Sequence, residues 1–194
     1  VLYATGRKPN TANIGLENTD ITTNERGAIV VNDTCESSVP GVYAVGDVNG
    51  GPQFTYISLD DFRIVFGALT GNGQYTLKDR KNIPYTTFLT PPLARIGLTE
   101  EDSINKGYTV KTKEMLVATM PRAHVNDYLK GAFKIVVNAD NDLILGATLY
   151  SQGAEELINL IKMAMDNNIP YTYFKNQIFT HPTMAENLND LCNF

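Results

Sequence analysis

The residues with the clearest chemical potential lie near the end of the chain, where His181 is followed five positions later by Glu186. An imidazole titrates near physiological pH, so His181 is a candidate general base or acid. A carboxylate close by would favour the protonated ring and would orient it. The two residues are therefore a candidate catalytic pair, although the group that they would deprotonate is not evident in this stretch.

The same glutamate also has a purely structural interpretation. Thr183 and Glu186 fit the capping-box pattern, in which the two residues at the start of a helix exchange hydrogen bonds between side chain and backbone. In this interpretation the cap and the catalytic pair compete for one carboxylate. The other histidine, His124, has no acidic partner at a comparable spacing and is assigned to a loop or to the surface.

A second candidate site is the Gly46-Asp47 step, which ends an apolar run over residues 41–47 that is typical of a buried strand. Open α/β sheets bind ligands at the carboxyl ends of their strands, and glycine permits a close approach to the backbone. The aspartate would accept a hydrogen bond from a sugar or polyol hydroxyl. A plain strand-to-loop turn would explain the dipeptide by itself, so neighbouring motifs must decide.

Composition limits the class of protein. The chain has 194 residues, 43% of them hydrophobic, which suits one domain or two small ones. The net charge of -5 argues against nucleic acid as a partner. No apolar run is long enough for a membrane span and the first residues lack a secretory pattern, so a cytoplasmic location is expected. Cys35 and Cys192 make neither a disulfide framework nor a metal-binding pattern, so no metal site is expected.

The elements that must position these residues fall into two parts. In the first part, strands are predicted over residues 1–4, 27–31 and 41–47, and apolar periodicity predicts a helix over residues 56–69. A polar stretch over residues 74–82 then places a boundary near Lys81. Because the chain starts on an apolar run that looks like the end of a strand, we expect it to be part of a longer protein.

The second part mixes strands with helices. Strands are predicted over residues 86–89, 108–118, 133–137 and 143–150, and helices are predicted to start at Thr99 and to cover residues 157–165. Turn residues between the last two strands indicate an antiparallel hairpin. This order predicts an α+β fold.

Four motifs, taken together, resemble the flavoprotein disulfide reductases, which include glutathione reductase, dihydrolipoamide dehydrogenase and mercuric reductase. The motifs are ATGRKPN at residues 4–10, VPGVYAVGD at 39–47, IGLTE at 96–100 and HPTMAE at 181–186. Their order corresponds to the C-terminal part of that family's chain. The stretch QFTYISLDDFRIV at residues 53–65 looks most like a bacterial subgroup linked to reactive-chlorine resistance.

The resemblance implies a division into three parts. Residues 1–10 would end an NAD(P)-binding domain, residues 11–80 would be the C-terminal segment of an FAD-binding α/β domain, and residues 81–194 would be a dimerisation domain. It also implies a homodimer, formed through residues 81–194, that uses FAD and NAD(P)H to reduce a small disulfide. The family's Cys-x4-Cys pair and its glycine-rich dinucleotide motifs are not in these 194 residues, so the chain alone is expected to be inactive.

The resemblance also implies roles for single residues. Asp47 would bind the ribityl chain of FAD, Gly46 would let the cofactor approach, and Thr55 would present its backbone N–H to the flavin ring. His181 and Glu186 would reach into the partner subunit's active site, where His181 would shuttle the proton that activates a thiol.

Two alternatives stay open. In one, the same fold acts on a mercuric or cupric ion or on oxygen. Mercuric reductases carry a C-terminal cysteine pair, and here only Cys192 lies near the end. The other alternative is a non-catalytic module that serves self-association.

Overall fold

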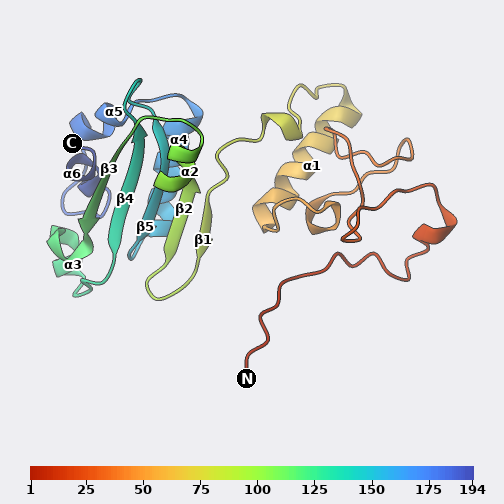
Figure 1. Cartoon of the computed structure of the whole chain (residues 1–194), viewed down its shortest axis with the longest axis horizontal. Coiled ribbons are helices and arrows are strands. Elements are labelled where there is room, and N and C mark those ends of the chain that lie inside the picture. The colour runs from red at the N-terminus through yellow and green to blue at the C-terminus, as the bar shows by residue number, and fades with distance from the viewer. The chain divides into compact units, whose positions relative to one another are not determined.

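The chain divides into two units, Val1–Arg80 and Lys81–Phe194. Figure 1 shows the computed structural model, which describes residues 1–194. The second unit combines an antiparallel sheet with packed helices, so the predicted α+β class is confirmed. None of the helices is both long enough and apolar enough to cross a membrane.

Five strands form the sheet of the second unit, in the order β1-β2-β5-β4-β3, and all neighbours are antiparallel. The strands are β1 (Tyr85–Thr87), β2 (Leu93–Gly97), β3 (Val110–Leu116), β4 (Ala132–Asn138) and β5 (Ile144–Tyr150). β4 and β5 form the predicted hairpin, and their register pairs Phe133 with Leu149 and Ile135 with Ala147. Because alternate residues of a strand share a face, these pairs line one side of the sheet.

The hydrophobic core of this unit lies between that face of the sheet and three helices. α4 (Ala154–Asp166) packs on β2 and β5, α6 (Asn187–Leu191) packs on β3 and β4, and α5 (Tyr171–Asn176) packs on α6. Leu188 and Leu191 of α6 are fully buried in this core. Burial of a leucine side chain stabilises a fold by roughly 1.5–3 kcal/mol, so α6 is firmly held. Glu186 directly precedes this helix.

Two short helices complete the second unit. α2 (Glu100–Asn105) begins at the Thr99 cap that the sequence predicted, and α3 (Pro121–Val125) carries His124. His124 is exposed, as expected, but it lies in a helix and not in a loop. The strand predicted over residues 108–118 is shorter at both ends, and β2, α3 and α5 were not predicted as elements.

The first unit is built around one long helix, α1 (Thr55–Thr70), which confirms the predicted helix. Three short 3-10 turns accompany it: η1 (Leu16–Asn18), η2 (Gly46–Asn49) and η3 (Leu77–Asp79). The apolar stripe that predicted α1 is exposed, because Leu59, Phe62, Phe66 and Leu69 are between 49% and 65% accessible. The helix buries its other side instead, through Ile57, Asp61 and Ile64.

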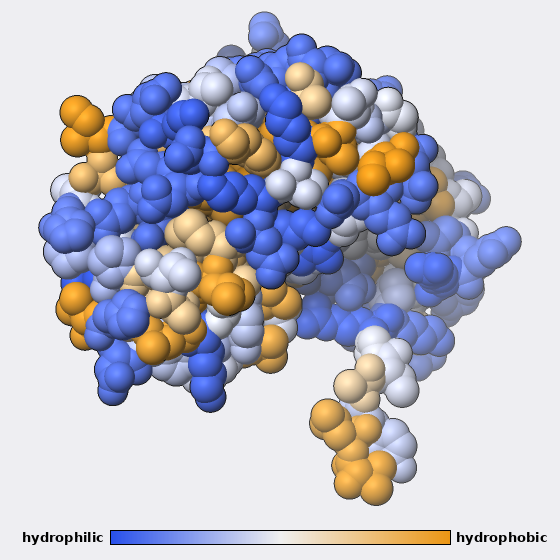
Figure 2. Space-filling view, turned by 60° about the vertical axis from the view of Figure 1, so that its left-hand side comes forward, coloured by the Kyte–Doolittle hydropathy of each residue, from blue (hydrophilic) through white to orange (hydrophobic).

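The three strands predicted in the first unit are not formed. Residues 1–10 have no regular secondary structure, and the hydrophobic residues at the N-terminus stand away from the rest of their unit, where Figure 2 shows them in orange. Residues 27–31 and 41–47 contribute only the isolated bridges Thr23–Ile29 and Glu36–Tyr43. A strand needs a neighbour along its length to satisfy its backbone groups, and these segments make only single bridges and scattered hydrogen bonds, such as that from the Ile29 N–H to the Val48 carbonyl. Gly46 and Asp47 therefore lie in η2 and not at the end of a strand.

Candidate functional site

His181 and Glu186 are in direct contact: Nδ1 of His181 lies 2.7 Å from Oε2 of Glu186. The segment that carries them runs between α5 and α6 and is fixed by the side-chain amide of Asn189. This amide donates to the carbonyl oxygens of Phe174 and Gln177, at 2.7 Å and 2.9 Å. The side chain of His181 is 69% exposed, whereas that of Glu186 is only 18% exposed. The pair therefore presents the imidazole on the surface above a mostly covered carboxylate.

Glu186 makes both of the contacts that the sequence presented as competing, one with His181 and the other a reciprocal pair of hydrogen bonds with Thr183. Its Oε1 accepts a hydrogen bond from the Thr183 N–H at 3.1 Å, while its Oε2 faces His181. The Thr183 hydroxyl in turn accepts from the Glu186 N–H at 3.2 Å. The two contacts do not compete for the carboxylate, because each of its oxygens makes one of them.

The contact determines which ring nitrogen of His181 is available for chemistry. The hydrogen bond from His181, helped by the Thr183 N–H and opposed by burial, lowers the pKa of Glu186 below its ordinary value. An ionised carboxylate can only accept hydrogen bonds, so a neutral His181 carries its proton on Nδ1. Its Nε2 then holds the lone pair and has no partner within the chain. This arrangement suits a general base that acts at Nε2.

The η2 turn holds two of the predicted cofactor residues. Gly46 has φ +73°, and a Cβ added there would lie 2.5 Å from the Ser58 hydroxyl oxygen. Glycine is therefore needed at this position for packing on α1, whether or not a ligand binds. Asp47 follows in the same turn; its side chain is 51% exposed and lies 3.6 Å from the Arg7 guanidinium.

Thr55 is the first residue of α1 and is exposed. No side chain caps this end of the helix, and the Thr55 N–H has no acceptor within the chain. The first N–H groups of a helix carry its positive dipole end and attract electron-rich groups. Asp47 and Thr55 therefore supply an acceptor and a donor within the first unit, whereas His181 and Glu186 belong to the second unit.

A buried ionic cluster beneath η2 was missed by the sequence analysis. Asp61 of α1 is fully buried, and its Oδ2 accepts from the Gly46 N–H at 2.7 Å and from Asn49 Nδ2 at 2.9 Å. Its Oδ1 pairs with Arg80. The available signal was the adjacent acids Asp60 and Asp61 within a largely apolar helix.

Both cysteines are buried and unpaired by disulfides. Burial raises the pKa of the Cys35 thiol to about 11 and that of the Cys192 thiol to about 12. Thiolates are the reactive form of cysteine, so burial disfavours the reactive form of both residues in the folded chain. The structure contains no group of three or more histidine, cysteine, aspartate or glutamate side chains that could hold a metal ion.

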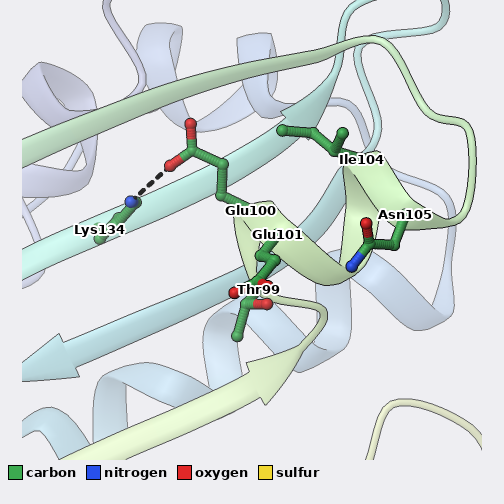
Figure 3. A pocket seen from close by; sticks show the side chains of 6 residues that line it. All are labelled: Thr99, Glu100, Glu101, Ile104, Asn105 and Lys134. Carbon is green, nitrogen blue, oxygen red and sulfur yellow. Dashed lines mark hydrogen bonds and ion pairs between the residues drawn. The ribbon is translucent and has the colours of Figure 1, made fainter.

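A shallow surface depression of about 500 Å³ lies beside α2 and β4. Figure 3 shows its six lining residues: Thr99, Glu100, Glu101, Ile104, Asn105 and Lys134. Glu100 and Lys134 pair at 2.7 Å, and Thr99 caps α2. None of the predicted site residues lines this depression, and Lys134 is already paired with Glu100.

Comparison with known proteins covers both units. Residues 83–192 match the family model described as pyridine nucleotide-disulphide oxidoreductase, dimerisation domain, and residues 1–61 match the model described as pyridine nucleotide-disulphide oxidoreductase. The probable pyridine nucleotide-disulfide oxidoreductase RclA of Escherichia coli strain K12 is 47% identical over 191 residues, which are 98% of this chain and 43% of the relative.

One further relative and one solved structure extend this comparison. A mercuric reductase of Staphylococcus aureus is 36% identical over 188 residues, covering 97% of this chain and 34% of the reductase. The solved Cu(II) complex of the HOCl-induced flavoprotein disulfide reductase RclA from Escherichia coli superposes with a TM-score of 0.95 at 47% identity, covering 97% of this chain and 44% of that chain. The chain thus spans less than half the length of each of these relatives.

Proposed function

The chain belongs to the pyridine nucleotide-disulphide oxidoreductase family, and from this premise we propose that it serves a flavin-dependent enzyme. In this proposal it supplies the flavin-contacting turn, the interface of a homodimer and an acid–base pair. The enzyme takes electrons from NAD(P)H and reduces a small disulfide. Family membership confirms the resemblance that was drawn from the four sequence motifs.

The proposal assigns a part of the enzyme to each region of the chain. Residues 81–194 form the dimerisation domain, residues 11–80 form the C-terminal segment of the FAD-binding domain, and residues 1–10 end the NAD(P)-binding domain. The family models matched at residues 1–61 and 83–192 support this assignment, as does the division of the chain after Arg80.

The first unit offers groups whose chemistry fits FAD. The half-exposed carboxylate of Asp47 accepts hydrogen bonds of the kind that ribityl hydroxyls donate. The free N–H of Thr55 at the positive end of α1 suits an electron-rich ring. Gly46 keeps the turn against α1 and so sets the position of Asp47. FAD, when bound, supplies the electron transfer between the nicotinamide and the disulfide.

The second unit supplies proton transfer. Thiol–disulfide exchange proceeds by attack of a thiolate, so a base that removes a thiol proton accelerates it. Glu186 keeps the proton of a neutral His181 on Nδ1, which leaves Nε2 free to take a thiol proton and to return it. Because both cysteines of this chain are buried, we place the thiol that His181 serves elsewhere in the protein or in the partner subunit. The 2.7 Å contact that leaves Nε2 free is the observation that carries this function.

The test compares the complete gene product with its His181→Gln variant, using NADH or NADPH and a small disulfide as substrates. General acid–base catalysis contributes about 10²–10⁴-fold, so the variant should lose that factor in rate while it keeps its flavin. His124→Gln is the matched control, because His124 is also exposed but contacts only the Ala118 carbonyl. Full activity in His181→Gln would refute the assignment.

A metal ion is the second candidate substrate. The observations in its favour are the mercuric reductase relative and the Cu(II) complex of RclA. Cys192 does not favour it, because this thiol is fully buried. Rates measured with mercuric, cupric and disulfide substrates in parallel decide between the two classes, and the substrate with the highest kcat/KM identifies the function.

A further inference from the structure

We propose that Asp61 and Arg80 are positioning residues for the η2 turn and that they hold Asp47 where FAD meets it. The inference rests on the proposed FAD-binding function. It adds two residues that the four family motifs of the sequence analysis do not include.

Asp61 holds the turn at both of its ends. A single carboxylate oxygen, Oδ2, accepts from the Gly46 N–H at 2.7 Å and from Asn49 Nδ2 at 2.9 Å. The side chain of Asn49 also reaches the Ala44 carbonyl at 3.2 Å. Asp47 lies between these two anchors, and its own carboxylate stays half-exposed. The turn is therefore tied to α1 by its flanking groups, while its ligand-binding group is left available.

Arg80 allows Asp61 to remain a buried anion. The side chain of Asp61 is 0% exposed and that of Arg80 is 10% exposed, and the two form an ion pair. The Arg80 Nε also contacts Asp60 Oδ2 at 2.7 Å. An unpaired buried charge is strongly unfavourable, and removal of one partner leaves the other uncompensated. Without Arg80 the carboxylate of Asp61 would be an uncompensated buried charge, and its hydrogen bond with the Gly46 N–H would be lost.

The η2 turn also packs closely on α1 at Gly46. A Cβ at Gly46 would collide with Ser58, which lies about one helical turn before Asp61 on α1. Arg80 is the last residue of the first unit. The Asp61–Arg80 ion pair thus links the η2 turn, which carries Asp47, to the last residue of the first unit.

The test measures the FAD dissociation constant of the complete gene product and of its Arg80→Ala, Arg80→Lys and Asp61→Asn variants. Apparent affinity falls in proportion to the population of the binding-competent turn, so a turn that is competent about one-tenth of the time raises the dissociation constant roughly tenfold. We expect at least this loss in Arg80→Ala and Asp61→Asn and partial recovery in Arg80→Lys. Hydrogen exchange of the Gly46 amide should accelerate more than exchange elsewhere in the unit.

Two controls separate positioning from general destabilisation. Lys78→Ala removes a cation from the same segment, but Lys78 is 76% exposed and pairs only with Asp33; it should leave FAD affinity unchanged. Ile64→Val weakens the buried side of α1 without removing a charge. The inference is overturned if the folded fraction of Arg80→Ala binds FAD within roughly twofold of the wild type, or no more weakly than Ile64→Val does. A wild type that binds no FAD would overturn the proposed function itself, which is a distinct result.

Discussion

Replacement of Glu186 by glutamine separates the two roles of this side chain. Glutamine keeps one oxygen, which can accept the Thr183 N–H that Glu186 now binds at 3.1 Å. Its amide nitrogen then takes the place of Oε2, 2.7 Å from His181 Nδ1. Because that nitrogen donates and cannot accept, we expect the proton of the neutral ring to move from Nδ1 to Nε2. The nitrogen proposed as the base would no longer have a lone pair.

The expected effects on stability and on reactivity differ widely. The contact with Thr183 is retained, and an ion pair with one exposed partner, here the imidazole of His181, contributes only about 0.2–1 kcal/mol. The free energy of unfolding should therefore fall by less than about 1 kcal/mol, a shift in Tm of no more than roughly 4–8 °C. The rate of the proton-transfer step in the complete enzyme should fall by about 10²–10⁴-fold. Glu186→Ala should cost about 0.5–1.5 kcal/mol more, because it also removes the acceptor of the Thr183 N–H.

Nitrogen NMR of the imidazole rings provides the direct assay, because the chain has only two histidines. The Nε2 of His124 lies 2.8 Å from the Ala118 carbonyl oxygen, which can only accept, so a neutral His124 is protonated at Nε2. At a pH where both rings are neutral, the wild type should show one ring of each tautomer. In Glu186→Gln both rings should carry the proton on Nε2, and His124→Gln assigns the signals.

The reasoning fails if His181 keeps its proton on Nδ1 in Glu186→Gln. It also fails if Glu186→Gln loses as much stability as Glu186→Ala, since the two carboxylate oxygens would then not have separate partners. Either result would leave Glu186 as a structural cap that does not select the reactive nitrogen of His181.

Three further predictions concern the stability and reactivity of the chain. Thr99→Ala removes the hydroxyl that accepts the Asp102 N–H at 3.0 Å, and thermal unfolding should show a loss of about 1 kcal/mol; an unchanged Tm would contradict this. The pKa of Glu186 is lowered in the folded state from its ordinary 4.5, so its contribution to stability is complete above that pH and is lost as the pH falls further. Glutamine does not titrate, so lowering the pH through this range should reduce the free energy of unfolding of Glu186→Gln less than that of the wild type. Denaturant titrations at several pH values measure the difference. Burial raises the pKa of Cys35 to about 11 and that of Cys192 to about 12, so iodoacetamide should modify neither thiol in the folded chain and both in urea; labelling of the folded chain at the unfolded rate would contradict this.

Sequence patterns predicted the second unit better than the first, because the strands of the second unit pair with one another. β4 and β5 have apolar residues at alternate positions, and both occur where they were predicted. β2 was missed because it follows two prolines and is short; it becomes a strand through pairing with β5, as Ala94 does with Leu149. Pairing of this kind depends on distant residues that local patterns do not report.

The first unit shows the opposite case. Residues 27–31 and 41–47 have the composition of strands but only isolated bridges, because composition reports a local preference and a strand requires a neighbour. The stripe of α1 predicted the helix correctly, whereas Leu59 and Phe66 of that stripe are exposed and Asp61 is buried. Periodicity therefore identified the helix but not the side that packs within the chain.

The candidate site was predictable in its residues and not in its contacts. The spacing of His181 and Glu186 indicated a pair, but the division of two oxygens between two partners depends on the orientation of the carboxylate. The role of Asp61 was hidden because its partner Arg80 lies 19 residues further along the chain. An acidic residue in a helix is expected on the solvent-exposed side, because acidic side chains are rarely buried without a counter-ion.

The visible absorbance spectrum of the complete gene product, with an FAD titration of its Asp47→Ala variant, tests the central claim most directly. We predict bound flavin in the wild type. In the variant we predict FAD affinity that is lower by roughly 10–100-fold, the value of one hydrogen bond to a charged group, in protein that remains folded. A colourless wild type that still self-associates would contradict the account and indicate a non-catalytic module. An Asp47→Ala variant that binds FAD as tightly as the wild type would contradict the role assigned to the η2 turn.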